Sequence, residues 1–144
     1  MNLVQCSIND EQYALKILDK GQVAKYDKVD SVMRERDNMF LLADHPNITR
    51  LEMTFQDEMS LFFLLEYVQN GTLTTLIKKL GKLPYELTKF YAAEILSALE
   101  YMRQHRIVHR DLKPENIIYD PRTSEIKLID FGLSCEMKQD RLSD

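Results

Sequence analysis

The sequence predicts an α+β fold, because strand patterns dominate its first half and helical patterns most of its second half. One helical pattern, Asp30–Ala43, interrupts the strand patterns of the first half. Two further helical patterns, Leu73–Leu80 and Pro84–Gln104, lead into a polar segment at 109–132. This segment contains two loops joined by a short hairpin. Its side chains suggest a chemical function, and we expect the other elements to support it.

Length and composition are those of an ordinary globular chain, with 144 residues of which 29% are charged. The net charge of −4 gives no basic patch and no reason to expect nucleic acid as a partner. No apolar run approaches the ~20 residues that cross a bilayer, and Met1–Cys6 lacks the pattern of a secretory signal. Cys6 and Cys135 have no metal-binding spacing. We therefore expect free thiols in a reducing compartment, and so a cytoplasmic protein.

The first two strands are expected at Asn2–Ile8 and Tyr13–Leu18, with a turn at 9–11 between them. Alternation puts Ala14 and Lys16 on the same face of the second strand. A small residue beside a lysine can admit a planar ring and let the ammonium group reach its phosphates. Taken alone, a lysine on a strand is far more often a solvent-exposed charge.

The helix predicted over Asp30–Ala43 has apolar side chains at helical spacing, including Val29, Val32, Met33, Met39 and Phe40. Two strands are expected after it, Ile48–Phe55 and Leu61–Tyr67, separated by the polar turn Gln56–Ser60. The second of these strands is nearly all apolar, as a buried strand should be.

Two helices are predicted next. Leu73–Leu80 ends at Gly81, and Pro84–Gln104 has its proline in the first turn. The longer helix carries a wide apolar stripe, made of Leu87, Phe90, Tyr91, Ile95, Ala98, Leu99 and Met102. We interpret its tyrosine and methionine as core residues rather than as a cofactor-binding face.

The polar segment begins with H-R-D-L-K-P-E-N at 109–116 and ends with D-F-G at 130–132. Asp111 can take up or orient a hydroxyl proton, and Lys113 stands two residues later, where it can meet phosphate charge. Asn116 and Asp130 offer the hard oxygen ligands that suit Mg²⁺. Phosphoryl transfer needs these parts, because its catalysis is mostly positioning and charge neutralisation.

An apolar run at Glu125–Ile129 is expected to hold the second loop at the end of a rigid strand. The alternative is a polar loop followed by an ordinary turn. Eight positions match the fixed pattern, and at residue frequencies of roughly 1 in 20 such a match arises by chance on the order of once in ten billion registers.

At these residues the chain resembles the eukaryotic protein kinases. The stretches Y-A-L-K-I-L, R-E-R-D-N-M, H-P-N-I, T-F-Q-D, Y-V-Q-N-G-T-L and F-Y-A-A-E-I-L-S-A-L-E-Y narrow the resemblance to the AGC group, and within it to the phosphoinositide-dependent protein kinases. The likeness runs from about Tyr13 to Gly132, and Lys113 in D-L-K-P-E-N is typical of serine/threonine kinases.

The resemblance implies an incomplete two-lobed fold. A partial N-lobe, an antiparallel sheet with one helix, would cover residues 1–65, and a hinge would cover 66–71. A partial, mainly helical C-lobe would cover 72–144 and end early in the activation segment.

The resemblance also implies an ATP- and Mg²⁺-dependent serine/threonine protein kinase. It gives catalytic roles to Asp111 and Lys113 and a phosphate-holding role to Lys16, which would pair with Glu35. Asn116 and Asp130 would hold the metal. Nucleotide-binding positions carried over from the family are Ala14, Lys16, Leu65, Glu66, Val68, Glu115 and Ile118. Among them, the backbone of Glu66 and Val68 would bond the adenine edge, with Leu65 at the gate of the pocket. Met39, Leu51, His109 and Phe131 would align as a regulatory spine.

Protein substrates are the partners that the resemblance implies, and it adds a docking pocket for the phosphorylated tails of client kinases. Matching positions are Lys20, Val32, Met33, Arg36, Thr54, Gln56, Leu61 and Phe63. Apolar members would hold aromatic anchors, and Arg36 with Thr54 and Gln56 would bind the phosphate. The alternative is that these are only core and surface residues.

The chain also departs from the family. Thr72 replaces a glutamate that bonds ribose, Ile129 stands where threonine is frequent, and Cys135 replaces a basic residue. The glycine-rich loop and the later helices are not in the sequence. We therefore expect the apolar stripe of the longest helix to be uncovered, and no measurable transfer to a protein by the 144-residue chain. The alternative function is a catalytically inactive fragment that binds nucleotide or docks on a partner.

Overall fold

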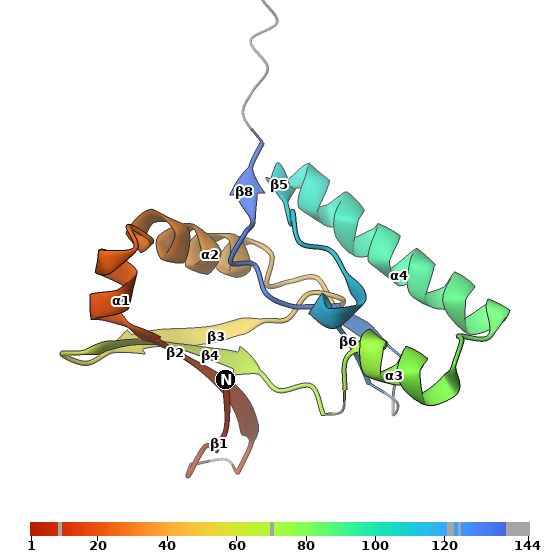
Figure 1. The fold of residues 1–144 in the computed structure, drawn as a ribbon, viewed down its shortest axis with the longest axis horizontal. Coiled ribbons are helices and arrows are strands. Elements are labelled where there is room, and N and C mark those ends of the chain that lie inside the picture. Colours follow the sequence, from red (N-terminus) through yellow and green to blue (C-terminus); the bar gives the residue numbers. More distant parts are fainter. Residues whose placement is uncertain (9, 70, 121–122, 124, 138–144) are drawn as a thin grey trace, which may run out of the picture.

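The protein was analysed as a computed structural model that describes residues 1–8, 10–69, 71–120, 123 and 125–137 (Figure 1). Asn9 of the predicted first turn and Asn70 of the predicted hinge lie outside these ranges. The described residues form an α+β fold, with an antiparallel sheet and two helices in the first half and a mainly helical second half. The predicted fold class is confirmed.

Four strands form the sheet of the first half, in the order β1-β2-β4-β3 with every neighbour antiparallel. They are β1 (Asn2–Gln5), β2 (Gln12–Asp19), β3 (Leu51–Gln56) and β4 (Ser60–Glu66). Strand β1 is shorter than the predicted Asn2–Ile8. Its end is fixed by a turn in which Cys6 N–H donates to Glu11 O at 2.9 Å and Asp10 N–H donates to Cys6 O at 2.9 Å.

Two helices, α1 (Lys20–Lys25) and α2 (Val29–Leu41), lie on the same side of this sheet (Figure 1). Helix α1 was not predicted, although Asp19 is a favourable N-cap and its side chain accepts a hydrogen bond from Gln22 N–H at 2.7 Å. Helix α2 matches its predicted position and turns two polar residues, Glu35 and Asn38, into the interior. Both polar side chains have hydrogen-bond partners there, Lys16 for Glu35 and Ser134 for Asn38.

The second half begins with two helices and ends with short paired strands. Helix α3 has the predicted bounds because Thr72 caps its start and Gly81 ends it with φ of 75°, a left-handed conformation that glycine adopts without strain. The elements of this half are α3 (Leu73–Leu80), α4 (Tyr85–Gln104), β5 (Ile107–Val108), a 3₁₀ turn (Pro114–Asn116), β6 (Ile117–Tyr119), β7 (Ile126–Leu128) and β8 (Cys135–Glu136). Strands β6 and β7 form an antiparallel hairpin, and β5 pairs with β8.

A short connection ties the two halves together. Residues 47–49 leave α2 and run beside β7, where Leu128 N–H donates to Asn47 O at 2.8 Å and Thr49 N–H donates to Leu128 O at 3.0 Å. Ile48, which was predicted to start the third strand, is therefore engaged with the hairpin, and β3 begins only at Leu51.

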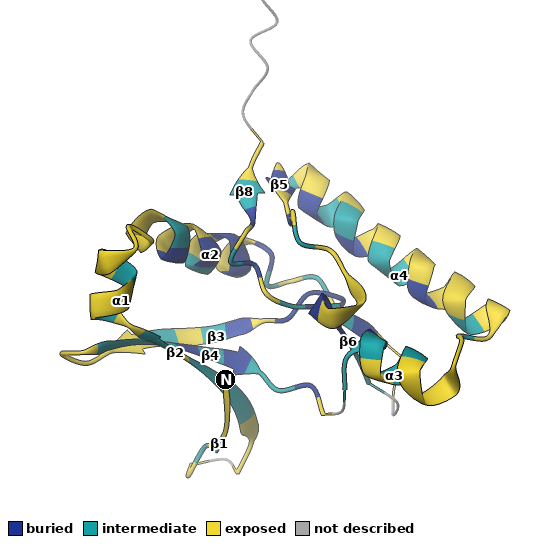
Figure 2. Cartoon of the chain, viewed as in Figure 1, coloured by how far each residue is buried: buried dark blue, intermediate teal, exposed yellow. Residues whose placement is uncertain are grey.

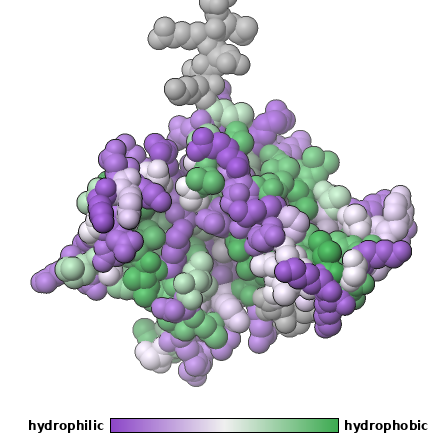
Figure 3. Space-filling view, viewed as in Figure 1, coloured by the Kyte–Doolittle hydropathy of each residue, from purple (hydrophilic) through white to green (hydrophobic). Residues whose placement is uncertain are grey.

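The expectation of an uncovered apolar stripe on the longest helix was wrong. Helix α4 packs that stripe on β5 and β7, so Tyr91, Ala98 and Met102 are buried and only Phe90, 45% exposed, remains at the surface (Figure 2). The partly buried members are Leu87, Ile95 and Leu99. Outside the stripe, α4 exposes the apolar side chains of Tyr85 and Leu96. Figure 3 shows hydrophobic side chains interspersed with hydrophilic ones on the viewed face of the molecule. The stripe thus finds its cover within the chain itself.

None of the described helices combines the length and the apolar character that crossing a bilayer requires.

Candidate active site

A lysine–glutamate pair joins β2 to α2 at the centre of the first half. Lys16 Nζ lies 2.6 Å from Glu35 Oε1, and the Glu35 side chain is only 6% exposed. A carboxylate buried to this degree needs a partner, because desolvation of an unpaired charge is costly. The structure brings these two predicted residues together across 19 positions of sequence.

A cleft of about 610 Å³ opens between the sheet, the segment after β4 and the β6–β7 hairpin. Its walls are mostly apolar, with charged groups gathered around Lys16, Glu35 and Asp130. Six of the predicted nucleotide-binding residues line it, namely Ala14, Lys16, Leu65, Glu66, Val68 and Ile118. Glu115 lies on the exposed 3₁₀ turn and does not line the cleft, so its role stays a prediction.

Several lining residues were not predicted from the sequence, and the buried Thr49 is the polar one among them whose side chain is unsatisfied within the described part of the chain. Thr49 is 4% exposed, and among the described residues its Oγ1 has no hydrogen-bond partner. A buried hydroxyl without a partner is unfavourable by about 1–3 kcal/mol. No pattern in the sequence marks Thr49, because it lies in the connection between α2 and β3 rather than on a periodic element.

The loop after β5 places Asp111, Lys113 and Asn116 in one hydrogen-bonded group. Lys113 Nζ donates to both carboxylate oxygens of Asp111, at 2.9 and 2.8 Å. Asn116 Nδ2 donates to Asp111 O and to Asp111 Oδ2, both at 2.8 Å. The hydrogen bonds from Lys113, followed by that from Asn116, lower the pKa of Asp111 below its ordinary value. Asp111 is therefore ionised at neutral pH and fixed in direction by two neighbours.

The buried side chain of His109 links this loop to the residue before the D-F-G segment. Its Nδ1 accepts from Asp111 N–H at 3.3 Å, so its Nε2, 3.1 Å from Ile129 O, is assigned as the protonated nitrogen. Burial lowers the pKa of His109, which agrees with a neutral ring. The ring also contacts the Phe131 ring, with centroids 4.9 Å apart. The loop at 109–116 and the D-F-G segment are thus packed on one another.

Two residues of these loops have unusual backbone conformations. Arg110 and Asp130 have φ of 64° and 61°, in the left-handed region that residues other than glycine, asparagine and aspartate rarely adopt. Hydrogen bonds hold both turns. Arg110 Nε donates to Leu133 O at 2.6 Å, and Gly132 N–H donates to Asp130 Oδ1 at 3.3 Å.

The segment after Phe131 is anchored to α2. The Ser134 hydroxyl donates to Phe131 O at 2.6 Å and accepts from Asn38 Nδ2 at 2.9 Å, and Asn38 and Ser134 are both buried. The buried polar side chains of α2 therefore serve the cleft, since Glu35 holds Lys16 and Asn38 holds the turn that follows Asp130.

The donor set at the mouth of the cleft suits a hard divalent cation that is also bound by phosphate. Asn116 uses its Nδ2 toward Asp111, which leaves its Oδ1 as the group for a cation, and Asp130 adds a carboxylate. Among the described residues, no three histidine, cysteine, aspartate or glutamate side chains form a metal-binding group. An amide oxygen and a carboxylate are ligands that Mg²⁺ accepts, and Mg²⁺ is commonly held by one or two protein ligands together with substrate phosphates.

Of the four residues predicted to align as a spine, all are buried, namely Met39, Leu51, His109 and Phe131. Contact between His109 and Phe131 is observed, and the alignment of the full set stays a prediction. Thr72, which replaces a glutamate in the subfamily pattern, uses its hydroxyl at the start of α3, where Oγ1 accepts from Thr75 N–H at 3.4 Å.

Comparison with known proteins gives a consistent set of similarities. A family model described as "Protein kinase domain" matches residues 3–144. The chain is 48% identical over 134 residues to human 3-phosphoinositide-dependent protein kinase 1, covering 90% of this chain and 24% of that protein. It is 48% identical over 122 residues to serine/threonine-protein kinase ppk21 of Schizosaccharomyces pombe, covering 85% of this chain and 22% of ppk21. It is 44% identical over 122 residues to serine/threonine-protein kinase PKH2 of Saccharomyces cerevisiae, covering 85% of this chain and 11% of PKH2. The chain thus spans a quarter or less of these relatives.

Proposed function

The chain belongs to the protein kinase family, and from this membership we propose that its cleft binds ATP with Mg²⁺ for transfer of the terminal phosphate to serine or threonine hydroxyls of proteins. The observation that carries the proposal is the Lys16–Glu35 pair at 2.6 Å, facing Asn116 and Asp130 across one cleft. An ammonium group on one wall and oxygen ligands on the other suit a triphosphate held together with its metal.

Each residue has a defined task in this proposal. Glu35 keeps the Lys16 ammonium directed into the cleft, where it meets phosphate oxygens. Asn116 and Asp130 would hold Mg²⁺, which supplies charge neutralisation at the transferring phosphate when it is bound. Asp111, ionised and fixed by Lys113 and Asn116, accepts a hydrogen bond from the attacking hydroxyl and orients it.

Nucleotide binding by the 144-residue chain tests the proposal directly. We expect micromolar to millimolar affinity for ATP that depends on Mg²⁺, and a loss of about tenfold or more in Lys16→Met, because a charge-assisted hydrogen bond to phosphate is removed. The Asp130→Asn variant should lose most of the Mg²⁺ dependence. Isothermal titration with and without Mg²⁺ measures both effects.

Lys89→Met is the matched control for Lys16→Met, since Lys89 is exposed on α4, outside the residues that line the cleft. Equal ATP affinity in Lys16→Met and Lys89→Met would contradict the assignment of the cleft.

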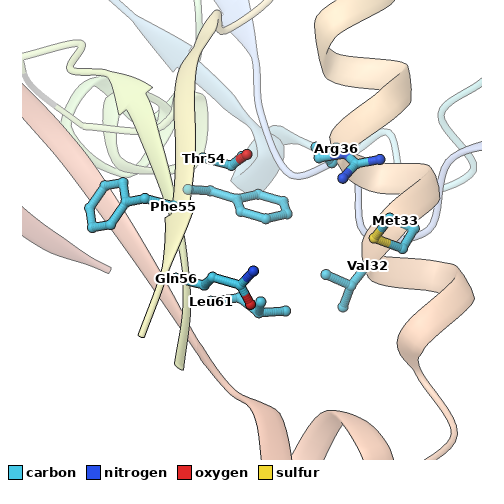
Figure 4. A pocket seen from close by; sticks show the side chains of 8 residues that line it. Val32, Met33, Arg36, Thr54, Phe55, Gln56 and Leu61 are labelled. Atoms are coloured by element: carbon cyan, nitrogen blue, oxygen red, sulfur yellow. The ribbon is translucent and has the colours of Figure 1, made fainter. Parts of the chain in front are cut away.

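A second candidate function, docking of a protein partner, is favoured by a cavity beside α2. This cavity of about 270 Å³ lies between α2 and strands β3 and β4 (Figure 4). Seven of the eight predicted docking residues line it, namely Val32, Met33, Arg36, Thr54, Gln56, Leu61 and Phe63. An adjoining cavity of about 130 Å³ shares Val32, Met33 and Leu61 with it and adds Lys20.

The side chains of this cavity suit an aromatic, phosphorylated peptide. Val32, Met33 and Leu61 give it an apolar floor, and Arg36 provides a cation at its rim (Figure 4). Arg36 is paired with Asp37, with Nη2 2.7 Å from Oδ1, so an incoming phosphate has to compete with that carboxylate. We propose that the cavity takes the phosphorylated aromatic tail of a client kinase.

We expect a peptide with aromatic residues and a phosphorylated serine or threonine to bind about 5- to 10-fold more tightly than its unphosphorylated form. Arg36→Ala should erase this difference, because a charge-assisted hydrogen bond is lost, though partly screened by solvent. Fluorescence anisotropy with both peptides measures it. Arg34→Ala, on the same helix but outside the cavity, is the control and should keep the difference. Equal affinity of the two peptides for the unchanged protein would sink the docking proposal.

A further inference from the structure

A lysine of the β6–β7 hairpin reaches the last residue of β4. Lys127 Nζ lies 2.9 Å from Glu66 Oε1 and also donates to Pro46 O at 2.8 Å. The two charged side chains are 18% and 24% exposed, so the pair is shielded from most of the solvent. Most surface ion pairs contribute little because water screens them and both side chains are free. This one differs, since Lys127 is held by two partners from two other segments.

The second oxygen of Glu66 is also engaged. Glu66 Oε2 accepts from Arg50 N–H at 3.3 Å, and the Glu66 backbone N–H donates to Arg50 O at 2.9 Å. Glu66 is therefore fixed by its main chain and by both carboxylate oxygens. It is the last residue of β4 and lines the cleft.

The connection at 46–50 lies between these two groups and is itself bound to the hairpin. Asn47 Nδ2 donates to Ile126 O at 2.9 Å, and Leu128 N–H donates to Asn47 O at 2.8 Å. Lys127 thus stands between two residues of β7 that hold the connection, while its own side chain passes over that connection to Glu66. The hairpin, the connection and the end of β4 form one continuous hydrogen-bonded unit.

From this geometry we propose that Lys127 is a positioning residue for base recognition, acting through Glu66 on the backbone of residues 66–68. The inference rests on the proposed function, in which the backbone of Glu66 and Val68 meets the edge of the adenine ring. A backbone edge that is fixed before binding loses less conformational freedom on binding. Lys127 itself is not among the residues that line the cleft, so its effect on a nucleotide has to pass through Glu66.

Comparing the affinities for ATP and for inorganic tripolyphosphate distinguishes this positioning role of Lys127 from general support of the fold. ATP uses both the base edge and the phosphate groups of the cleft, whereas inorganic tripolyphosphate uses only the phosphate groups. With Mg²⁺ present, Lys127→Met should weaken ATP binding about 5- to 10-fold, because a part-buried charge-assisted hydrogen bond is lost. It should leave the affinity for tripolyphosphate unchanged. Lys127→Arg should restore most of the ATP affinity, and Lys89→Met is the matched control without effect.

A double variant tests the route through Glu66. The Glu66→Gln and Lys127→Met changes should each weaken ATP binding, and the double variant should lose no more than the larger single effect, because the two residues form one unit. Additive losses would overturn the proposed route.

Amide hydrogen exchange at residues 66–68 tests the inference without any nucleotide. Faster exchange there in Lys127→Met than in Lys89→Met, with the rest of the described chain unchanged, is the expected result. Unchanged exchange at 66–68 would overturn the inference, as would equal losses for ATP and tripolyphosphate. A chain that shows the exchange effect but binds neither ligand would contradict the proposed function while leaving the coupling of Lys127 to this segment in place.

Discussion

Phosphoryl transfer is expected to fall by a factor of about 10²–10⁴ when Asp111 is replaced by alanine, the range that positioned acid–base groups contribute. The measurement uses a chimera in which residues 3–137 of this chain replace the corresponding segment of human 3-phosphoinositide-dependent protein kinase 1, its 48% identical relative. The carboxylate accepts hydrogen bonds from Lys113 and Asn116, so in the proposed function its removal takes away the group that orients the hydroxyl. Radiolabelled transfer from ATP to a serine or threonine peptide gives the turnover.

The affinity for ATP should change little in this variant, since Asp111 is not among the residues that line the nucleotide cleft. A drop in turnover with unchanged ATP affinity is the signature of a group that acts on the acceptor rather than on the nucleotide. Asp44→Ala, an exposed aspartate beyond α2, is the control and should retain full activity. Turnover of the Asp111→Ala chimera near that of the control would refute the assignment of Asp111.

The largest expected effect on stability is that of Phe131→Ala. Phe131 is 0% exposed and packs against His109, with ring centroids 4.9 Å apart. Truncation of a buried phenylalanine costs about 3–5 kcal/mol, which is a large share of the ~5–15 kcal/mol that separates a folded domain from its unfolded chain. We expect Phe131→Ala to unfold at markedly lower urea concentration than the unchanged chain.

Phe90→Ala offers a matched comparison, since the same atoms are removed from a side chain that is 45% exposed on α4. The loss of unfolding free energy there should be about 1 kcal/mol or less, as for most surface substitutions. Equal shifts of the urea midpoint in the two variants would show that Phe131 is not part of the core that joins the loops.

The elements that the sequence predicted best are those with strong local signals. Helix α3 has the predicted bounds because a threonine cap and a glycine stop frame it, and α4 begins one residue after Pro84. Pairing of Lys16 with Glu35 followed only from the resemblance, since nothing local connects two residues 19 positions apart. The observed ion pair shows that the family motifs predict a contact between distant residues that hydrophobic periodicity does not predict.

Other features depend on partners that no local pattern reveals. Helix α1 has only six residues and begins directly after β2, so no loop in the sequence separates the strand from the helix. The β5–β8 ladder joins two-residue strands, which are too short for an alternation to be recognised. The residues of the apolar stripe of α4 were predicted correctly. The prediction that the stripe is exposed was wrong, because β5 and β7 pack against it. The positions of Thr49 in the cleft and of Lys127 beside Pro46 depend on contact between the connection at 46–50 and the hairpin, which no local pattern predicts.

The left-handed residues of the two loops also shape mutational tolerance. At Asp130, with φ of 61°, most replacement side chains meet a steric penalty of about 1–2 kcal/mol that glycine and asparagine avoid, whereas Arg110, with φ of 64°, already carries this penalty in the unchanged chain. Most changes at Asp130 therefore meet two separate filters, one set by the backbone and one by the lost side chain. Asparagine at position 130 passes the first filter and keeps an oxygen ligand, although it gives up the negative charge. Unlike glycine, asparagine also keeps the side-chain oxygen that accepts a hydrogen bond from Gly132 N–H, so we expect Asp130→Asn to leave the loop folded.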